Sequence, residues 1–525
     1  MPGMNQSAAR RVTVTDTPRT DVLIVGSGIM GAVVARLLRE ADPALDITMV
    51  DGGTAIGETP GLHLHDLDDP VLWSRYNRRV ATGIQGMYTG AEVVREVAGS
   101  LTDLRPGMFH ALAFGEDAEA MPATALAWNA GGMGVHWTAA TPWPAGDEVF
   151  DFGDPDRWAA DLDTARRVLA VTPSAIGPTE VGRMVLDVLR RRFDGVGPGD
   201  RRPQPMPMAV TATASGPMPR TAPGTIFPAI AAGGDPGFTL TTGTLATTLL
   251  VCGGRVAGAR LRRVADGAER ELLANAVVVC ADVLRTPQLL FASGIRPAAL
   301  GRYLNEHAFI TARVLLDLDR YGLGLGSLPL PRPGEFSTDA LWLPRNGAAQ
   351  PFHGQVMNRT YVDEGGQALA HSVGLALYVP VESRPENRLV FSETRTDLAG
   401  MPRITVEFGY SDADRALIGR ALDEVRSIAE EFGSFDPATE RALLPPGSSL
   451  HQTGTVRAGP ADDGTSVCDP DGRVWGFDNL YVAGNGVIPT AMAANVTLTG
   501  AVTAVRAARA VAERHAAPAA HREEA

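Results

Sequence analysis

The sequence predicts an α/β fold in which one domain is inserted into another, and three features support this prediction. A glycine-rich turn joins an apolar strand to a helix near the N-terminus, within residues 21–53. Apolar and polar residues alternate in several segments of 316–410, which is typical of antiparallel strands. Apolar sequence with a glycine turn returns at 480–511. Together these features predict a Rossmann-like domain that carries an inserted antiparallel-sheet-plus-helices domain.

The first stretch, DVLIVGSGIMGAVVARLLREADPALDITMVDGG at 21–53, has the pattern of a dinucleotide-binding unit. An apolar strand leads into Gly26, Gly28 and Gly31, and a helix-like segment follows. In such a unit the first glycine permits the turn, the second lets the backbone approach a pyrophosphate, and the third lets the helix pack on the strand. Asp51 ends the second strand, about 20 residues beyond the last glycine, where a carboxylate can bind a ribose hydroxyl. The pattern leaves NAD, NADP and FAD open.

Composition and charge argue against several other classes of protein. The chain has 525 residues, of which 45% are hydrophobic and 20% charged, as in ordinary globular proteins. A net charge of −13 argues against binding to nucleic acid, which needs a basic surface. Cys252, Cys280 and Cys468 have neither a disulfide nor a metal-site spacing, and HLHDLDDP at 63–70 matches no ligand pattern. We therefore expect no metal site.

Nothing in the sequence resembles a membrane span or an export signal. No window reaches the roughly 18 consecutive apolar residues that a spanning helix needs. Polar sequence follows the Arg10-Arg11 pair where a twin-arginine signal would have an apolar segment. Scarce cysteines fit a reducing compartment. We expect a cytoplasmic protein with no membrane partner and with flexible tails at 1–19 and 516–525.

Periodicity and turn residues predict the remaining elements. Helices are expected at 32–40, 156–170, 180–193, 412–432 and 498–511, and strands within 238–264, at 276–281 and at 480–483. Thr286-Pro287 predicts a helix start, because proline is favoured in the first turn. Residues 60–90 are expected to form an exposed loop, either a lid or disordered. The glycine- and tryptophan-rich segment 127–144 runs close against a flat ligand or forms a packed aromatic corner, and its pattern does not decide between the two.

Several segments together resemble the glucose-methanol-choline (GMC) family of FAD-dependent oxidoreductases, and within it the pyranose oxidase branch. They are VGSGIMG at 25–31, GGMGVHWTAATP at 131–142, VVVCADVLRTPQLLFASGI at 277–295, GRYLNEH at 301–307, NRLVFSETRTDLAGMPRITVEF at 387–408, HQTGT at 451–455 and NLYVAGNGVIPTAMAANVTLT at 479–499. The resemblance spans most of the chain. It implies the GMC fold and narrows the dinucleotide to FAD.

The resemblance implies two catalytic residues, His451 and Asn495. A histidine can take the proton of an alcohol while the hydride leaves the carbon, and an amide can hold the hydroxyl oxygen in place. The flavin then carries the electrons. Because 44 residues separate His451 from Asn495 in the sequence, only the fold can bring them together.

The resemblance also implies which residues lie against the cofactor. Besides the first turn, these are Gly132, Met133, His136, Trp137, Thr138, Val256, Asn485 and Thr497. Thr138 is expected near the reactive edge of the flavin, and the Val256 backbone near the adenine. In pyranose oxidases a histidine in a Ser-Thr-His-Trp segment can be bonded covalently to the flavin. Here Gly134 and Val135 precede His136, so covalent attachment stays open.

The implied reaction is oxidation of a secondary hydroxyl of a pyranose, free or in an O- or C-glycoside, to a ketone at carbon 2 or 3. Oxygen, giving hydrogen peroxide, or a quinone would then reoxidise the flavin. A non-sugar alcohol is the alternative substrate, and a protein with structural FAD and no redox activity is the alternative of another class. The resemblance leaves open a monomer or a small homo-oligomer.

We expect the FAD-binding domain to be discontinuous. It would comprise 20–110, 225–315 and 445–515, and the substrate-binding domain with its connecting segments would comprise mainly 111–224 and 316–444.

Overall fold

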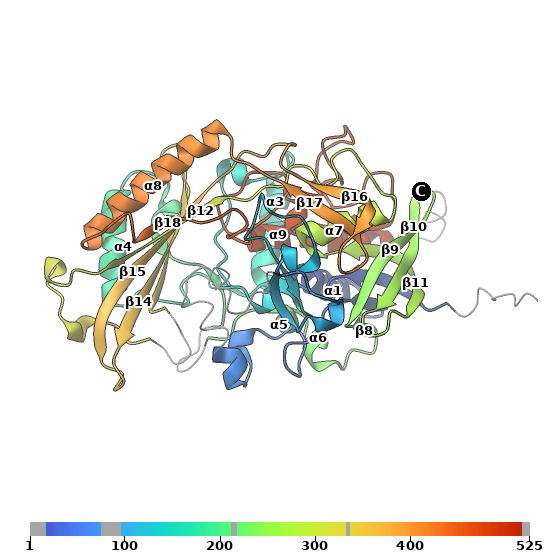
Figure 1. The fold of residues 1–525 in the computed structure, drawn as a ribbon, viewed down its shortest axis with the longest axis horizontal. Helices are drawn as coiled ribbons and strands as arrows, with labels where there is room; N and C mark the ends of the chain where they lie inside the picture. The colour runs from blue at the N-terminus through green and yellow to red at the C-terminus, as the bar shows by residue number, and fades with distance from the viewer. Residues whose placement is uncertain (1–16, 75–95, 212–217, 332–336, 517–525) are drawn as a thin grey trace, which may run out of the picture.

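The computed structural model describes residues 17–74, 96–211, 218–331 and 337–516. The larger part of the predicted 60–90 loop and most of both predicted tails therefore lie outside the described residues. Two large sheets organise the chain and lie toward opposite ends of the molecule (Figure 1). Among the described residues no helix is long and apolar enough to cross a membrane.

The first sheet has seven strands and contains the predicted parallel core. Its order is β8 (Phe238–Thr241), β2 (Ile47–Val50), β1 (Arg19–Val25), β11 (Glu269–Val279), β10 (Arg255–Arg263) and β9 (Thr244–Cys252), and β19 (Leu480–Val482) also pairs with β11. The strands β8, β2, β1, β11 and β19 run parallel, whereas β9 and β10 form the predicted hairpin. β11 is buried at 276–279, where β1 and β19 pair with it on its two sides, as a continuous apolar strand requires.

Helices cover both faces of this sheet. On β1, Val22 and Ile24 belong to the core that includes α1 (Ile29–Ala41), α9 (Thr497–Ala516) and α3 (Pro155–Val168). Leu23 and Val25 point to the other core, which includes α7 (Asp282–Ala292). This alternation is the period-2 pattern of a strand that is buried on both faces. The fold class and the predicted Rossmann-like domain are confirmed.

The helix α7 begins four residues earlier than Thr286-Pro287 predicted. Asp282 Oδ1 accepts hydrogen bonds from the backbone N–H groups of Leu284 and Arg285, and so satisfies two donors of the first turn. Pro287 lies inside the helix and cannot donate to the carbonyl of Val283. The hydroxyl of Thr455 donates to that carbonyl instead, at 2.6 Å. A side chain from a distant segment thus supplies the hydrogen bond that the internal proline removes from the helix.

The second sheet has six strands and is antiparallel, as predicted for the inserted domain. Its order is β18 (Arg441–Leu443), β12 (Ala308–Leu315), β15 (Ala368–Val379), β14 (His353–Val362), β13 (Asp339–Leu343) and β6 (Gln204–Pro205). The helices α4 (Glu180–Arg192) and α8 (Asp412–Phe432) share one hydrophobic core with it, and α8 lies across the sheet in Figure 1. β12 belongs to this sheet, although it falls within the range 225–315 that we assign to the FAD-binding domain.

The remaining elements are shorter or form separate strand pairs. They are the strand pairs β3 (Gly107–His110) with β4 (Ala125–Trp128), β5 (Val171–Thr172) with β7 (Met208–Ala209), and β16 (Arg388–Thr396) with β17 (Pro402–Glu407), and the short helices α5 (Pro223–Ile226) and α6 (Ala229–Ala232). Single 3-10 turns at Leu64–Asp66, Gly132–Val135 and Asn485–Val487 carry residues that lie at or beside the candidate site.

The six-stranded sheet turns a polar face away from α4 and α8. Leu341, Val356 and Leu377 pack in the core with these helices. The neighbouring positions along the same strands, Trp342, Gln355 and Tyr378, therefore point to the opposite face, because successive side chains of a strand alternate. This second face carries polar and aromatic side chains, which form one wall of the candidate site.

Candidate active site

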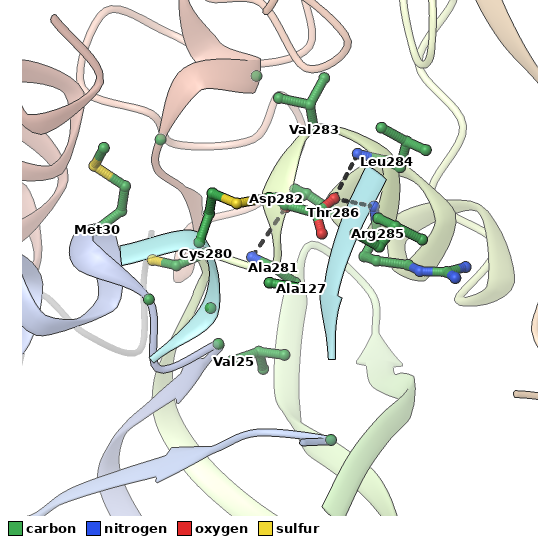
Figure 2. A pocket seen from close by; sticks show the side chains of 18 of the residues that line it. Val25, Met30, Ala127, Cys280, Ala281, Asp282, Val283, Leu284, Arg285 and Thr286 are labelled. Atoms are coloured by element: carbon green, nitrogen blue, oxygen red, sulfur yellow. Dashed lines mark hydrogen bonds between the residues drawn. The ribbon is translucent and has the colours of Figure 1, made fainter. Parts of the chain in front are cut away.

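An elongated pocket lies at the carboxyl ends of β1, β2 and β11, where open α/β sheets bind ligands. Val25, Val50 and Cys280, at the ends of these strands, line it. Figure 2 shows the run from Cys280 to Thr286 along this pocket, near Met30 of α1. Leu450, Gln452 and Thr497 also line it, so the pocket extends from the glycine turn to the C-terminal segments.

The three glycines of the first turn have the geometry that a pyrophosphate-binding turn requires. Gly26 has a φ of +105°, and a Cβ there would lie 2.4 Å from the carbonyl oxygen of Cys280. A Cβ on Gly31 would lie 2.1 Å from the carbonyl oxygen of Gly26, so only glycine lets α1 pack against the turn. Gly28 lines the pocket, and a Cβ there would have its nearest neighbour 3.9 Å away. The space in front of Gly28 is therefore open to a ligand.

The first turn of α1 presents the features of an anion site. Gly28, Ile29 and Met30 line the pocket, and neither a side-chain cap nor an acidic residue occupies this helix end. The first amides of a helix have no partner within it, and the helix dipole adds partial positive charge there. This end of the pocket fits the pyrophosphate of a dinucleotide.

Asp51, which we predicted to bind a ribose, follows β2 and lines the same pocket. Its Oδ2 accepts hydrogen bonds from the N–H and hydroxyl of Ser27 at 2.9 and 2.7 Å, and its Oδ1 accepts from Gly53 N–H at 2.9 Å. Burial raises the pKa of the Asp51 carboxyl, which these hydrogen bonds oppose. A carboxylate oxygen can accept more than one hydrogen bond, so Asp51 can still receive a ribose hydroxyl from the pocket that it lines.

Arg285 lines the pocket and belongs to a buried charge network. Its Nη1 donates to Glu116 Oε1 at 2.6 Å, to Asp397 Oδ2 at 2.7 Å and to Gln288 Oε1 at 2.9 Å. Its Nη2 has no hydrogen-bond partner among the described residues. Burial raises the pKa of Glu116 to about 7 in spite of the nearby guanidinium. Arg285 thus has a donor to spare at a pocket that would receive an anionic cofactor.

The segment 127–138 runs along the pocket. Gly132, Met133 and Trp137 line it, and a Cβ on Gly132 would lie 3.5 Å from the Cα of Gly28. Trp137 is also buried, and its Nε1 donates a hydrogen bond to the Thr221 carbonyl at 2.7 Å. The segment therefore lies where it could approach a ligand, as the first of its two interpretations requires, while Trp137 also packs as the second requires. Asn485 and Thr497, which we predicted as cofactor contacts, line the same pocket.

The ring of His136 points elsewhere. Neither His136 nor Thr138 is among the residues that line the pocket. His136 Nε2 lies 2.8 Å from Asn129 Oδ1, and Asn129 Nδ2 donates to the carbonyls of Ala130 and Gly132 at 3.1 Å each. Since the amide nitrogen is committed to two acceptors, its oxygen accepts from His136. The Nε2 of His136 therefore carries a proton.

The adenine contact that we predicted through the Val256 backbone needs correction. The Val256 N–H donates to Asn479 Oδ1 at 2.9 Å, and its carbonyl accepts from Asn479 Nδ2 at 2.8 Å. Val256 also lies outside the lining of the pocket. The partner strand β9 contributes Thr244, Leu245 and Ala246 to the lining instead. The prediction chose the wrong strand of the hairpin, because the sequence does not show which strand faces the ligand.

The beginning of the 60–90 segment is packed against the site, contrary to the exposed loop that we predicted. His63 and His65 are buried, and His63 Nε2 donates to the Trp137 carbonyl at 2.8 Å. His63 Nδ1 in turn accepts from His65 N–H at 3.0 Å, and His65 Nδ1 lies 3.0 Å from Asp66 Oδ1. In the ranges that the structure describes, no group of three or more His, Cys, Asp or Glu side chains could hold a metal ion.

The fold brings His451 and Asn495 together beside the pocket. Asn495 Nδ2 lies 3.3 Å from His451 Nε2, although 44 residues separate the two in sequence. Leu450 and Gln452, on either side of His451, line the pocket. Burial lowers the pKa of His451 to about 4, so the ring is neutral at pH 7 and can accept a proton. A neutral base beside an amide can act on an alcohol hydroxyl.

The polar face of the six-stranded sheet orients Asn495. Gln355 Nε2 donates to Asn495 Oδ1 at 2.5 Å, and the Tyr378 hydroxyl donates to Gln355 Oε1 at 3.5 Å. The oxygen of Asn495 is thereby occupied, and its nitrogen faces His451. The Tyr378 ring also lies close to three histidine rings, with centroid distances of 4.7 Å to His307, 5.8 Å to His451 and 5.4 Å to His353.

Two further buried histidines stand next to this pair. His307 Nε2 lies 2.8 Å from His451 Nδ1, and His307 Nδ1 lies 3.2 Å from the Met492 carbonyl. His353 Nδ1 accepts from Trp342 Nε1 at 3.0 Å. Burial lowers the pKa of His353 to about 3 and that of His307 well below its usual value. All three histidines of the cluster are therefore neutral at pH 7.

Two buried glutamates hold the backbone segments that carry His451 and Asn495. Glu306 accepts from the N–H of Gly447, from the Ser449 hydroxyl at 2.7 Å and from Gln452 Nε2 at 3.1 Å. These bonds fix a turn in which Leu450 has a positive φ of 59°. Burial raises the pKa of Glu306 to about 7.

Glu148 does the same for the second segment. Its Oε1 accepts from the N–H groups of Ala493 and Ala494 at 2.7 and 3.0 Å, directly before Asn495. Thus the backbone segments directly before His451 and Asn495 are each hydrogen-bonded to the carboxyl group of a buried glutamate.

None of these supporting residues was predicted from the sequence. His307 and Glu306 lie in GRYLNEH, a segment that we used only for the resemblance, and Gln355 and Glu148 lie in segments without a motif. A buried glutamate or histidine beside apolar residues gives no periodic signal. The one available signal was the pair of adjacent polar residues, Glu306 and His307, just before an apolar strand.

The fold and this site define a dinucleotide-dependent oxidoreductase, in which a histidine and an amide meet beside the cofactor pocket. Two family models described as GMC oxidoreductase match residues 226–309 and 383–504. The chain is 38% identical over 506 residues to a C-glycoside 3-oxidase of Microbacterium trichothecenolyticum, and the match covers 94% of this chain and 97% of that protein. The chain belongs to the GMC oxidoreductase family, which implies FAD as the dinucleotide.

More distant relatives agree with this assignment. A pyranose 2-oxidase of Tricholoma matsutake is 27% identical over 545 residues, covering 94% of this chain and 93% of that protein. Among solved structures, pyridoxine 4-oxidase from Mesorbium loti matches with a TM-score of 0.61 and 17% identity, covering 95% of this chain and all of the other. Formate oxidase from Aspergillus oryzae matches with a TM-score of 0.64 and 14% identity, covering 95% and 99%. These two structures share the fold.

Proposed function

We propose that this protein oxidises a secondary hydroxyl of a glycoside to a ketone at carbon 3 of the pyranose ring, with FAD as the hydride acceptor. The observation that carries the proposal is the approach of His451 and Asn495 to 3.3 Å beside a pocket that fits the dinucleotide. The 38% identity to C-glycoside 3-oxidases of Microbacterium trichothecenolyticum and Arthrobacter globiformis supports carbon 3 over carbon 2, since the pyranose 2-oxidases are 26–27% identical.

The mechanism follows from the hydrogen-bonding capacity of the two side chains. His451 Nε2 takes the proton of the substrate hydroxyl, and Asn495 Nδ2 donates a hydrogen bond to the oxygen that is losing it. As negative charge grows on that oxygen, the hydride leaves the adjacent carbon more easily. When bound, FAD would supply the hydride acceptor, and oxygen, giving hydrogen peroxide, or a quinone would be the final electron acceptor. Gln355 keeps Asn495 turned so that its nitrogen faces the substrate.

Holding the hydroxyl between two fixed groups also lowers the entropic part of the barrier. The two glutamates contribute here by fixing the turns before His451 and Asn495, because a displacement of either group would spoil the alignment. Burial keeps His451 neutral, so it is ready to accept a proton at pH 7.

We further propose that FAD is held without a covalent bond. A histidine that bonds to the flavin must bring a ring nitrogen to the flavin pocket. The observations that support this proposal are that His136 does not line the pocket and that its Nε2 is held by a hydrogen bond to Asn129. Precipitation of the purified protein with trichloroacetic acid is the test: the flavin should remain in the supernatant, and a yellow pellet would contradict this proposal.

Incubation of the purified protein with an aryl C-glucoside, the matching aryl O-glucoside and free glucose tests the substrate proposal. We expect both glucosides to give a 3-keto product, identified by NMR, at a higher kcat/KM than glucose. A 2-keto product as the main product would contradict the assignment of carbon 3. Turnover of none of the three would contradict glycoside oxidation. The same reaction run in air and with benzoquinone under nitrogen identifies the preferred electron acceptor.

A further inference from the structure

Hydrogen bonds link four groups of the site into a closed ring. It runs from the Met492 carbonyl to His307, from His307 to His451, from His451 to Asn495, and back along the backbone from Asn495 to Met492. The distances are 3.2 Å, 2.8 Å and 3.3 Å. The ring therefore starts and ends on one short segment, which Glu148 holds through the amides of Ala493 and Ala494.

The position of each proton in this ring follows from its two ends. A carbonyl oxygen can only accept, so His307 Nδ1 carries the proton. Because burial keeps His307 neutral, its Nε2 has a lone pair, and it accepts from His451 Nδ1. Neutral His451 then has its lone pair on Nε2.

The opposite end of the ring gives the same result independently. Gln355 donates to Asn495 Oδ1, which leaves Asn495 Nδ2 as a donor toward His451 Nε2. An atom that receives this donor must offer a lone pair. Both ends therefore fix the same tautomer of His451, with the proton on Nδ1 and the lone pair toward the substrate.

We propose that His307 is a positioning residue that holds His451 in the one tautomer able to act as the base. This inference rests on the proposed function, in which His451 takes the substrate proton. Without an acceptor at position 307, the Nδ1–H of His451 would be buried without a partner. The imidazole of His451 could then carry its proton on Nε2 instead. That tautomer points an N–H at the substrate hydroxyl and cannot accept its proton. When His451 does take the proton, His307 Nε2 also stabilises the imidazolium through the same hydrogen bond.

A merely structural role would predict a different pattern of variants. The His307→Leu variant replaces the imidazole with an apolar side chain of similar bulk and so removes the hydrogen-bond acceptor. His307→Gln can place an amide oxygen near the Nε2 position, where it can accept from His451 Nδ1, and His307→Asn is too short to do so. If only packing mattered, the three variants would rank by size and shape.

The experiment is anaerobic flavin reduction by the glycoside in stopped-flow, with the FAD-loaded protein. We expect His307→Leu and His307→Asn to reduce flavin roughly 100-fold more slowly than the wild type, the upper range for loss of a supporting partner, and His307→Gln to recover most of the rate. His371→Gln is the matched control: it replaces a buried histidine on β15, the strand that pairs with β12, which bonds Thr360 at 2.9 Å and takes no part in the site. It should keep the wild-type rate.

Histidine ¹⁵N NMR supplies the readout that packing would not move. In the wild type, the signals of His451, assigned by their loss in His451→Ala, should show an unprotonated Nε2, and in His307→Leu they should shift toward the other tautomer. A wild-type rate in both His307→Leu and His307→Asn, equal slowing in Leu and Gln variants that retain FAD, or an unchanged His451 tautomer would overturn the proposal. If His451→Ala itself reduced flavin at the wild-type rate, the proposed function would fail instead.

Discussion

The two ends of the site are built in different ways. The proposed cofactor cradle is local: Gly26, Gly28, Gly31 and Asp51 lie within one strand-helix-strand unit. The catalytic end is assembled from distant segments: His307 precedes β12, Gln355 lies on β14, and His451 and Asn495 come from two C-terminal loops. The shape of the cradle depends on close contacts between backbone atoms, because a Cβ added at Gly26 or Gly31 would collide with a backbone carbonyl. The activity of the catalytic end depends on which atoms carry protons. A substitution in the cradle should therefore weaken cofactor binding, and a substitution at the catalytic end should slow the reaction.

His451→Ala is expected to have the largest effect, and on the rate alone. Loss of a general base typically slows a reaction by 10²–10⁴-fold, so we expect flavin reduction by substrate to slow by about that factor. FAD should remain bound, because His451 itself is not among the residues that line the pocket. Stopped-flow reduction measures the rate, and the flavin-to-protein absorbance ratio measures occupancy. If the variant lost its FAD while the rate per bound flavin stayed at the wild-type value, the division between the two ends would be wrong.

Gly31→Ala should produce the opposite result. The new Cβ would lie 2.1 Å from the Gly26 carbonyl oxygen, so α1 must shift away from the turn. Overpacking of this kind costs about 1–3 kcal/mol, which corresponds to roughly a 5–150-fold loss of FAD affinity. Equilibrium titration of the apoprotein with FAD measures this loss, and the rate with saturating FAD should stay close to the wild type.

Gly419→Ala is the matched control for that variant. Gly419 lies in α8, and a Cβ added there would have nothing within 4 Å, so alanine fits without strain. FAD affinity should not change in this variant. An equal loss of affinity in both variants would mean that the effect of Gly31→Ala is a general one on stability and not a property of the cradle.

The same contrast explains how much the sequence could predict. The cradle is encoded by neighbours in sequence, so spacing alone identified its glycines and Asp51. His451 and Asn495 were identified only through the family resemblance, because nothing within HQTGT shows that Asn495 lies 3.3 Å away. Gln355 and Glu148 could not be found at all, and Glu306 and His307 gave only the weak signal of a polar pair before an apolar strand. Their roles depend on hydrogen bonds between segments far apart in the chain.

Two of the corrections, at Val256 and at Pro287, have the same origin. The sequence showed the β9–β10 hairpin but not which of its strands faces the pocket, so the contact was placed at Val256 in error. It also showed Pro287 but not Thr455, whose hydroxyl satisfies the carbonyl that the proline leaves without a donor. In each case a tertiary contact decided the outcome.

Glu148→Gln should have a moderate effect at the catalytic end. The carboxylate accepts the amides of Ala493 and Ala494 and so fixes the segment before Asn495. Hydrogen bonds to a charged group contribute about 1.5–3 kcal/mol and those to a neutral group about 0.5–1.5 kcal/mol, so we expect roughly a tenfold slower reduction of flavin. The adjacent Asp147→Asn is the control, because Asp147 is exposed and pairs with Arg345 outside the site. A rate loss in Asp147→Asn as large as in Glu148→Gln would argue against a role in positioning.

Near neutral pH the smallest effect is expected from pH itself, and the pH dependence of flavin reduction tests the electrostatics of the catalytic end. His451 must be neutral to act as the base, and burial lowers its pKa from the usual 6.5 to about 4. The rate should therefore be fully present above pH 6.5 and should be lost only as the pH falls through about 4. His307 and His353, whose pKa values burial also lowers, stay neutral over this range. A fall of the rate centred near pH 6.5 would mean that His451 is hydrated and not buried in the working enzyme. A step near pH 7 that disappears in Glu306→Gln would belong to Glu306, because burial raises the pKa of that carboxyl to about 7.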